Sequence, residues 1–166
     1  MGQDIILNNV QEDVKILNMD EDIFHMVMKL SLDINLSYMV TYDLILSHYF
    51  PPCKGYITTA RSHEKIYINR YEDDMLTPVF IIKILSSTDV MNIHDTGIGI
   101  IDEPVEVMDH YEVDVMEGII INSLFWRHYK IERSESKLNI KIDQNSRNNF
   151  HDISSYRSLR NIVDGI

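Results

Sequence analysis

The chain has few of the residues that build disulfide frameworks, membrane spans or secretion signals. Cys53 is the only cysteine among 166 residues, so no disulfide can form within the chain and we expect a reducing compartment. No apolar run approaches the roughly 18 residues that a membrane helix needs. The first residues show no basic segment followed by an apolar one, so we do not expect secretion. Alanine occurs once, at Ala60, which points to an AT-rich genome, as in many parasites and large DNA viruses.

Positive charge is also scarce. Lys and Arg total 15 against 26 Asp and Glu, which gives a formal net charge of -11. This balance opposes binding to nucleic acid and to anionic membranes, because both present negative groups that basic side chains must neutralise. Hydrophobic residues make up 45% of the chain, enough to bury a core. We therefore expect one domain over residues 1–166 whose partner is a protein.

What the chain does have is a long alternation of apolar and polar residues, "FHMVMKLSLDINLSYMV", over residues 24–40. The even positions from Phe24 to Val40 are all apolar, and most odd positions are polar. Period-two alternation is typical of a half-buried β-strand. A straight strand of this length would exceed about 50 Å, so we expect a bend near Asp33–Asn35, as in a small closed barrel.

Further strand-like runs predict an all-β barrel or sandwich. They are Val14–Met19, Tyr42–Phe50, Lys65–Asn69, Pro78–Leu85, Tyr111–Asn122, Phe125–Glu132 and Lys137–Asp143. The one helical pattern is "SSYRSLRNIVDGI" near the C-terminus, with Ser154 or Ser155 as the N-cap. Its apolar face would carry Tyr156, Leu159 and Ile162 or Val163.

The segment "HDTGIGIIDEP", residues 94–104, is the most motif-like stretch. Asp95, Gly97 and Gly99 resemble the nucleotide box of histidine kinases, although no glycine-rich lid follows. "GIGIIDEP" also resembles the uracil-pocket hairpin of trimeric dUTPases, with Asp102 as the water-activating residue, but the C-terminus is not the glycine-rich arm of that family. A tight turn, in which the two glycines supply positive φ, is the reading that we favour.

The remaining polar residues do not converge on one chemistry. The seven histidines show no paired spacing of the kind that zinc sites have. Cys53 fits a surface thiol, and Asp102, Glu103 and Glu106 fit a solvated face. We therefore predict no catalytic residue, no metal and no cofactor.

The only cluster of aromatic and basic residues is "FWRHYK", which begins with Phe125 and Trp126. Such a cluster can stack bases. Against the acidic charge of the whole chain, a protein contact or core packing is the better interpretation.

Three segments resemble the smallest acidic subunit shared by eukaryotic RNA polymerases I, II and III, common subunit eight. They are "MKLSLDINLSYM" (28–39), "DHYEVDVMEG" (109–118) and "KLNIKIDQNSRNNF" (137–150). They occur in the order of the family, and the matching parts, about residues 3–50 and 109–150, cover a little over half of the chain. The family's glycines around the third segment are missing here, and residues 51–108 have no counterpart.

The resemblance implies an OB-like antiparallel β-barrel with residues 51–108 as an insertion. The short C-terminal helix is expected from the residue pattern, and the final strand of the family is not evident in residues 154–166. It also implies a non-catalytic subunit of a DNA-dependent RNA polymerase that docks on the largest subunit. The interface would include Phe125, Trp126, Arg147, Asn149 and Phe150. Such a subunit would be nuclear in a cell, or cytoplasmic if a large DNA virus encodes it. The alternatives are a dUTPase-like trimer without activity and a viral all-β protein that binds a host protein.

Overall fold

A computed structural model describes residues 19–30, 38–62, 64–85, 102–135, 137–143 and 148–166. The chain forms two compact units. The helical unit comprises residues 1–49 and 150–165, and the sheet unit comprises residues 50–149 and 166. The expectation of one domain, with residues 51–108 as an insertion, stays a prediction.

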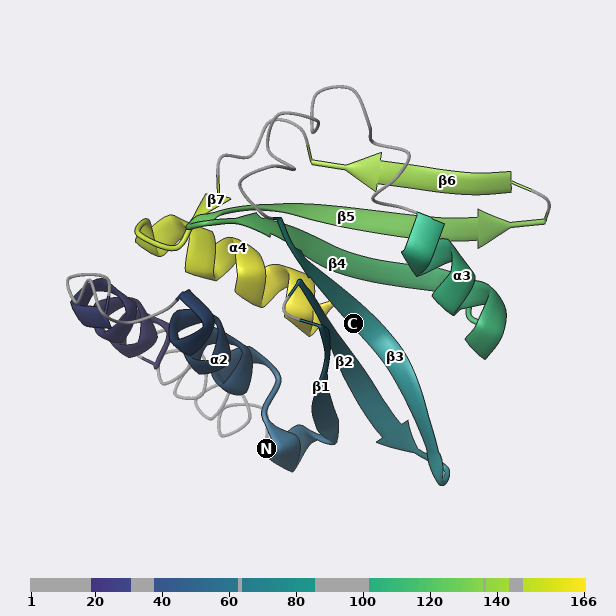
Figure 1. Cartoon of the computed structure of the whole chain (residues 1–166), viewed down its shortest axis with the longest axis horizontal. Coiled ribbons are helices and arrows are strands. Elements are labelled where there is room, and N and C mark those ends of the chain that lie inside the picture. The colour runs from purple at the N-terminus through teal and green to yellow at the C-terminus, as the bar shows by residue number, and fades with distance from the viewer. Residues whose placement is uncertain (1–18, 31–37, 63, 86–101, 136, 144–147) are drawn as a thin grey trace, which may run out of the picture. The chain divides into compact units, whose positions relative to one another are not determined.

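The sheet unit contains a mixed sheet with the strands in sequence order (Figure 1). The strands are β1 (Tyr56–Ser62), β2 (Lys65–Glu72), β3 (Met75–Ile84), β4 (Val115–Asn122), β5 (Phe125–Ser134) and β6 (Lys137–Ile142). Neighbours are antiparallel except β3 and β4, which run parallel. A two-residue strand, β7 (Asn148–Asn149), pairs with the start of β5, and a 3-10 turn, η1 (Pro52–Lys54), precedes β1.

The predicted all-β barrel is wrong. Among the described strands, β1 pairs only with β2 and β6 pairs only with β5, so the sheet is open. Helices also account for much of the chain: residues 19–30, α2 (Tyr38–Tyr49), α3 (Asp102–Tyr111) and α4 (Ile153–Asp164). The fold is mixed α/β, so neither an OB-like barrel nor a sandwich describes it.

The long strand predicted over residues 24–40 is likewise wrong, because residues 19–30 and 38–49 are helical. The bend expected at 33–35 lies outside the described residues. Val27, an odd position, is fully buried, whereas Met26, an even one, is 48% exposed. Burial at Asp20, Phe24 and Val27 follows the spacing of a helix face and does not alternate.

The strand predicted over Tyr42–Phe50 is also helical. Its buried residues Tyr42, Ile45, Leu46 and Tyr49 lie three or four apart, which again is the spacing of one helix face. The run Val14–Met19 lies outside the described residues except for Met19, which is helical.

The strands predicted from Lys65 onward are confirmed at β2, β3, β5 and β6, with shifted ends. The run Tyr111–Asn122 is a strand only from Val115, since Tyr111 ends α3. The C-terminal helix is confirmed as α4, with Tyr156, Leu159 and Val163 buried on one face. Its N-cap is Asp152 and not Ser154 or Ser155: the Asp152 carboxylate accepts a hydrogen bond from the Ser154 backbone N–H at 3.0 Å.

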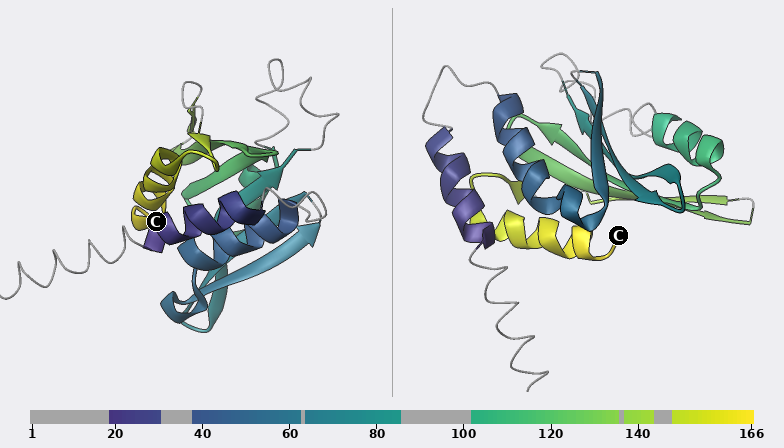
Figure 2. Two further views of the ribbon diagram at one scale, coloured as in Figure 1. Left: turned by 90° about the vertical axis from the view of Figure 1, so that its left-hand side faces the viewer. Right: turned by 90° about the horizontal axis from the view of Figure 1, so that it is seen from below.

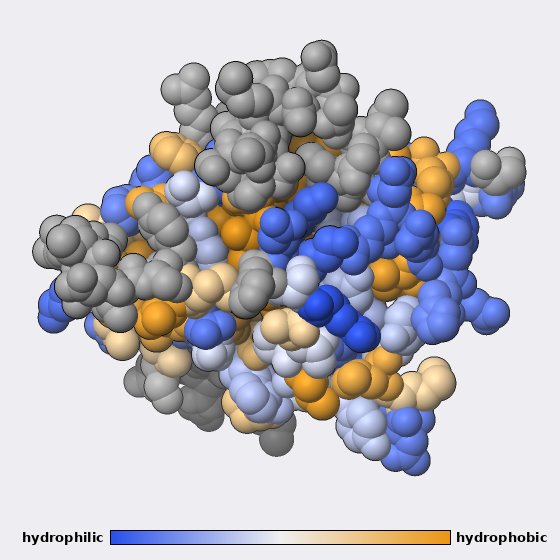
Figure 3. All heavy atoms as spheres, in the orientation of Figure 1, coloured by the Kyte–Doolittle hydropathy of each residue, from blue (hydrophilic) through white to orange (hydrophobic). Residues whose placement is uncertain are grey.

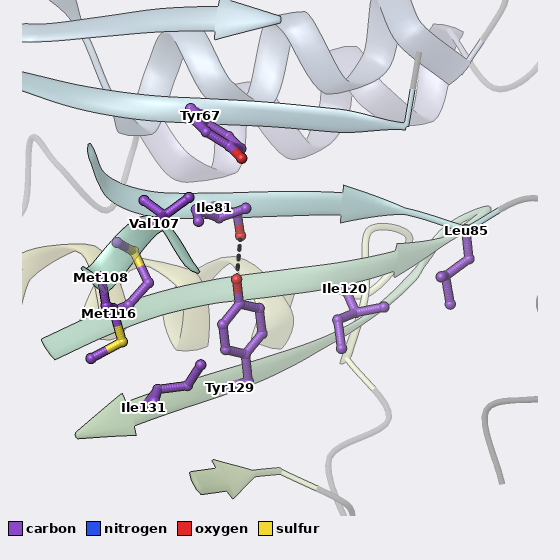
Figure 4. Packing of buried hydrophobic residues seen from close by; sticks show 9 residues of the cluster. All are labelled: Tyr67, Ile81, Leu85, Val107, Met108, Met116, Ile120, Tyr129 and Ile131. Carbon is purple, nitrogen blue, oxygen red and sulfur yellow. Dashed lines mark hydrogen bonds between the residues drawn. The ribbon is translucent and has the colours of Figure 1, made fainter. Parts of the chain in front are cut away.

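Helix α3 lies on one face of the sheet and closes an apolar core there (Figure 2). Val107 and Met108 of α3 pack against side chains of β2 to β5, among them Met116 and Ile131 (Figure 4). The Tyr129 ring reaches across β4, and its hydroxyl donates to the Ile81 carbonyl at 3.3 Å. None of the helices in the described ranges is long and apolar enough to cross a membrane.

Gly118 of β4 makes room for that ring. It pairs with Tyr129 across the strands, and a Cβ at this position would lie 2.0 Å from the Ile81 carbonyl oxygen and 2.3 Å from the Tyr129 hydroxyl. The place of glycine in "MEGIII" is therefore fixed by the close approach of Tyr129 and not by a turn.

Candidate functional site

The motif-like residues do not form a described site. His94, Asp95, Gly97 and Gly99 lie outside the described residues. Asp102 is the exposed first residue of α3 and not part of a hairpin, so it does not take the place that the dUTPase resemblance gave it. In the part of the chain that the structure describes, no three His, Cys, Asp or Glu side chains come together in a way that could hold a metal ion.

The five predicted interface residues are placed in different surroundings. Phe125 is 54% exposed and pairs with Asn149 of β7, so the structure brings these two together. Trp126 and Phe150 are each 1% exposed and belong to the cores, Phe150 to that of the helical unit. Arg147 lies outside the described residues. The role of these residues at an interface stays a prediction.

A buried polar cluster joins three helices of the helical unit. Asp20 Oδ1 lies 2.7 Å from His48 Nε2 and 2.7 Å from Arg160 Nη2. His48 Nε2 also lies 3.0 Å from Arg160 Nη2, so this nitrogen either donates to the Asp20 carboxylate or accepts from the guanidinium, and one tautomer does not do both. Burial alone would raise the pKa of Asp20, but the hydrogen bonds from His48 and Arg160 outweigh it and lower the pKa below its ordinary value.

Two tyrosines extend this cluster and anchor it to the backbone. The Arg160 guanidinium lies over the Tyr49 ring, 4.5 Å from its centroid. The Tyr49 hydroxyl donates to the Tyr156 carbonyl at 3.0 Å, and the Tyr156 hydroxyl donates to the Phe150 carbonyl at 2.9 Å. Burial raises the pKa of both tyrosines, so both remain neutral donors. Asp20 and Arg160 therefore satisfy each other inside the protein and tie the three helices together.

A second polar cluster lies beside the apolar core of the sheet unit. Glu103 of α3 accepts from the Tyr67 hydroxyl at 2.6 Å and pairs with Lys65 Nζ at 2.6 Å. Burial would raise the pKa of Glu103, but these two donors lower it overall. Burial, followed by the bond to Glu103, raises the pKa of Tyr67. The cluster docks the first turn of α3 on β2, a structural role.

Strand β6 forms one edge of the described sheet, and all its residues except Ile142 are exposed. The Asp143 N–H donates to the His128 carbonyl at 3.0 Å, so odd-numbered residues of this antiparallel pair direct their backbone groups toward β5. The N–H and C=O groups of Leu138, Ile140 and Ile142 therefore point away from the sheet. This edge is a row of unpaired donors and acceptors among the described strands.

The two faces of β6 differ. Leu138 and Ile140, 42% and 41% exposed, are on the face that carries the apolar core, and Ile140 pairs with the buried Ile131. Ile142 follows on the same face and packs against that core. Figure 3 shows hydrophobic surface beside hydrophilic surface toward the right-hand end of the place where Figure 1 draws β6. The apolar core thus continues to the open edge.

The opposite face of β4, β5 and β6 carries a ladder of alternating charges. Glu117 accepts from His128 at 2.8 Å and from Lys130 at 3.3 Å, and Lys130 also pairs with Glu132 at 3.0 Å. Lys141 of β6 lies 3.4 Å from Glu132. The two glutamates raise the pKa of Lys130, and Lys130 in turn lowers the pKa of Glu132. These pairs fix the register of β6 on β5 without covering its outer edge.

The other edge, β1, is less suited to pairing. Its register shifts between Ala60 and Ser62, a bulge that interrupts a regular ladder. Its middle residues, Thr58 and Thr59, are polar, whereas β6 is regular over its whole length. Sequence reasoning predicted the β6 strand but not its place at an edge. The alternation in "KLNIKI" indicates an amphipathic strand. It does not indicate which other strand lies beside it in the sheet.

Comparison with known proteins adds no identification. Scans against protein-family models and curated proteins, and a search of solved structures, found no match.

Proposed function

We propose that this protein is a non-catalytic interaction protein that binds an extended polypeptide by adding a strand to β6. The observation that supports the proposal is the open β6 edge, where outward backbone groups lie beside the exposed side chains of Leu138 and Ile140. In strand addition, main-chain hydrogen bonds supply affinity, and alternate side chains supply specificity. The strand that is added would place its apolar side chains beside Leu138 and Ile140 and cover the end of the core.

The partner expected from the sequence resemblance is a narrower proposal. A subunit that docks on the largest chain of an RNA polymerase was expected to be an OB-like barrel, and that fold is wrong here. The first of the three resembling segments, residues 28–39, is helical wherever it is described. We therefore carry forward only the coarser class, a protein that binds polypeptide. Very large polymerase chains are one result that the capture experiment below can return.

The test compares the two edges of the sheet. Ile140→Pro removes an outward N–H from β6 without removing a bond to β5. Thr58→Pro is the matched change on β1, because Tyr71 N–H donates to the Gly55 carbonyl, which leaves the N–H of Thr58 outward. Each tagged full-length chain would be used for affinity capture from native extract, with circular dichroism to verify folding.

We expect the captured polypeptide to be lost with Ile140→Pro and kept with Thr58→Pro. In the complex, the amides of Leu138, Ile140 and Ile142 should exchange hydrogen at least about tenfold more slowly than in the free chain. A complex that survives Ile140→Pro, with no added protection at β6, would contradict strand addition at this edge.

A further inference from the structure

We propose that the strand added to β6 is β6 of a second copy of this chain, in an antiparallel pair centred on Ile140. This inference rests on the proposed strand addition and names its partner. The two sheets would join into one continuous sheet about a two-fold axis. Such an axis keeps the apolar faces of both copies on the same side.

Residues 137–143, which are β6 and the residue after it, are complementary to a second copy of themselves in an antiparallel pair with Ile140 at its centre. Lys137 then lies opposite Asp143 of the second copy, and Leu138 lies opposite Ile142. Asn139 lies opposite Lys141, and Ile140 meets its own counterpart. Apolar residues therefore face apolar residues, and two pairs of opposite charge flank them. Both Lys137 and Asp143 are exposed in the single chain, where Asp143 also takes part in an interaction within its own chain.

The backbone favours the same register. The outward groups belong to residues 138, 140 and 142, and this register pairs 140 with 140 and 138 with 142. All six outward N–H and C=O groups of each copy are then bonded. The competing register, centred on Asn139, leaves residue 142 unpaired and places Lys137 opposite Lys141, where like charges repel. The lysines, which often protect strand edges, here select between two registers.

Cysteine cross-linking distinguishes the two registers. In a Cys53→Ser background, Ile140→Cys would place two thiols in a directly opposite pair, with Cα atoms about 5.5 Å apart, within the reach of a disulfide. Asn139→Cys is the matched control, because its two copies would be about 7–8 Å apart on the diagonal. We expect mild oxidation to convert most of the Ile140→Cys chain into a covalent dimer and little of the Asn139→Cys chain.

Charge exchange gives a second measurement that needs no cysteine. In analytical ultracentrifugation of the full-length chain, Lys137→Asp alone and Asp143→Lys alone should each weaken the dimer about tenfold. The double exchange should restore the affinity to within about threefold of wild type. All five positions used in these tests, 53, 137, 139, 140 and 143, are exposed, so the variants should fold.

Three results would overturn the proposal. They are a monomer up to about 0.5 mM, equal or greater cross-linking at position 139, and a double charge exchange that restores nothing. A monomer that still captures another polypeptide in an Ile140-dependent way would reject the second copy and leave strand addition intact. A monomer with no β6-dependent partner would reject both.

Discussion

The two compact units differ in what stabilises their interiors: apolar packing in the sheet unit, and a buried ion cluster in the helical unit. The sheet unit is closed by apolar side chains and one tyrosine hydroxyl that finds a backbone carbonyl, with Gly118 providing the space. The helical unit contains a buried carboxylate, that of Asp20, which contacts the guanidinium of Arg160 and the imidazole of His48. Apolar packing tolerates changes of charge and pH but not added volume. A buried ion cluster is sensitive to the loss of any member, because the remaining charge is left without a partner.

The largest expected effect is on the sheet unit, from added volume. Gly118→Ala places a Cβ against the Ile81 carbonyl oxygen and the Tyr129 hydroxyl, and neither can withdraw without opening the strand pair. We expect a loss of at least about 3 kcal/mol in the free energy of unfolding, measured by urea denaturation.

The matched control is Gly165→Ala, where the nearest heavy atom to a new Cβ is 3.4 Å away and φ is -88°. This variant should unfold within about 0.5 kcal/mol of wild type. If Gly118→Ala were equally mild, the close packing of Tyr129 over β4 would be wrong.

The next effect is on the helical unit, from a lost charge. Arg160→Met keeps much of the side-chain volume but leaves the buried Asp20 carboxylate with His48 alone. Breaking a buried pair in this way costs about 3 kcal/mol. Arg157→Met, at an exposed position of the same helix, is the control and should change stability by less than about 0.5 kcal/mol. Similar unfolding midpoints for the two variants would contradict the buried cluster.

A smaller effect on the free energy of unfolding is expected when the pH is lowered. The pKa of Asp20 is lower in the folded chain than its ordinary value of 3.8, so its contribution is present above that pH. As the pH falls through the lowered folded pKa, the carboxylate gains a proton and this contribution to stability is lost. Asp20→Asn should be less stable at neutral pH and should lose less stability between about pH 5 and pH 2.

Asp22→Asn is the control for this pH profile, since Asp22 is exposed on the same helix. Its stability should follow the wild-type curve in acid. Glu103 in the sheet unit also has a lowered pKa, so some acid sensitivity remains in every variant, and the difference between the Asp20→Asn and Asp22→Asn curves is the quantity to measure.

The sequence predicted the strands of the sheet unit better than the helices of the other unit, for a physical reason. β3 and β4 are rich in β-branched residues, which favour strands, and their burial agrees with that preference. Between residues 24 and 30 only Val27 is β-branched, and Phe24 and Met28 satisfy both a period of two and a helix turn. The alternation was therefore ambiguous, and the buried Val27 was the sign of a helix.

Other features depend on contacts that no local pattern contains. Asp20 and Arg160 are 140 residues apart in the sequence, so their pairing could not be predicted from spacing. The edge position of β6 follows from strand order, which the alternation in "KLNIKI" does not specify. Helix α3 did have a local signal, since Asp102, Glu103 and Pro104 are all residues that favour a first helical turn.

The smallest expected effect concerns the start of α4. The N-cap predicted from the sequence is Ser154 or Ser155, whereas the N-cap in the structure is Asp152. Asp152→Ala removes the side chain that accepts from the Ser154 N–H and should lower the free energy of unfolding, though by less than the variants above. The hydrogen bond to that N–H lowers the pKa of Asp152, so the cap weakens only in acid. Ser154→Ala should be nearly neutral, because only its backbone takes part. If Ser154→Ala were the more costly change, the cap predicted from the sequence would be restored and α4 would begin later.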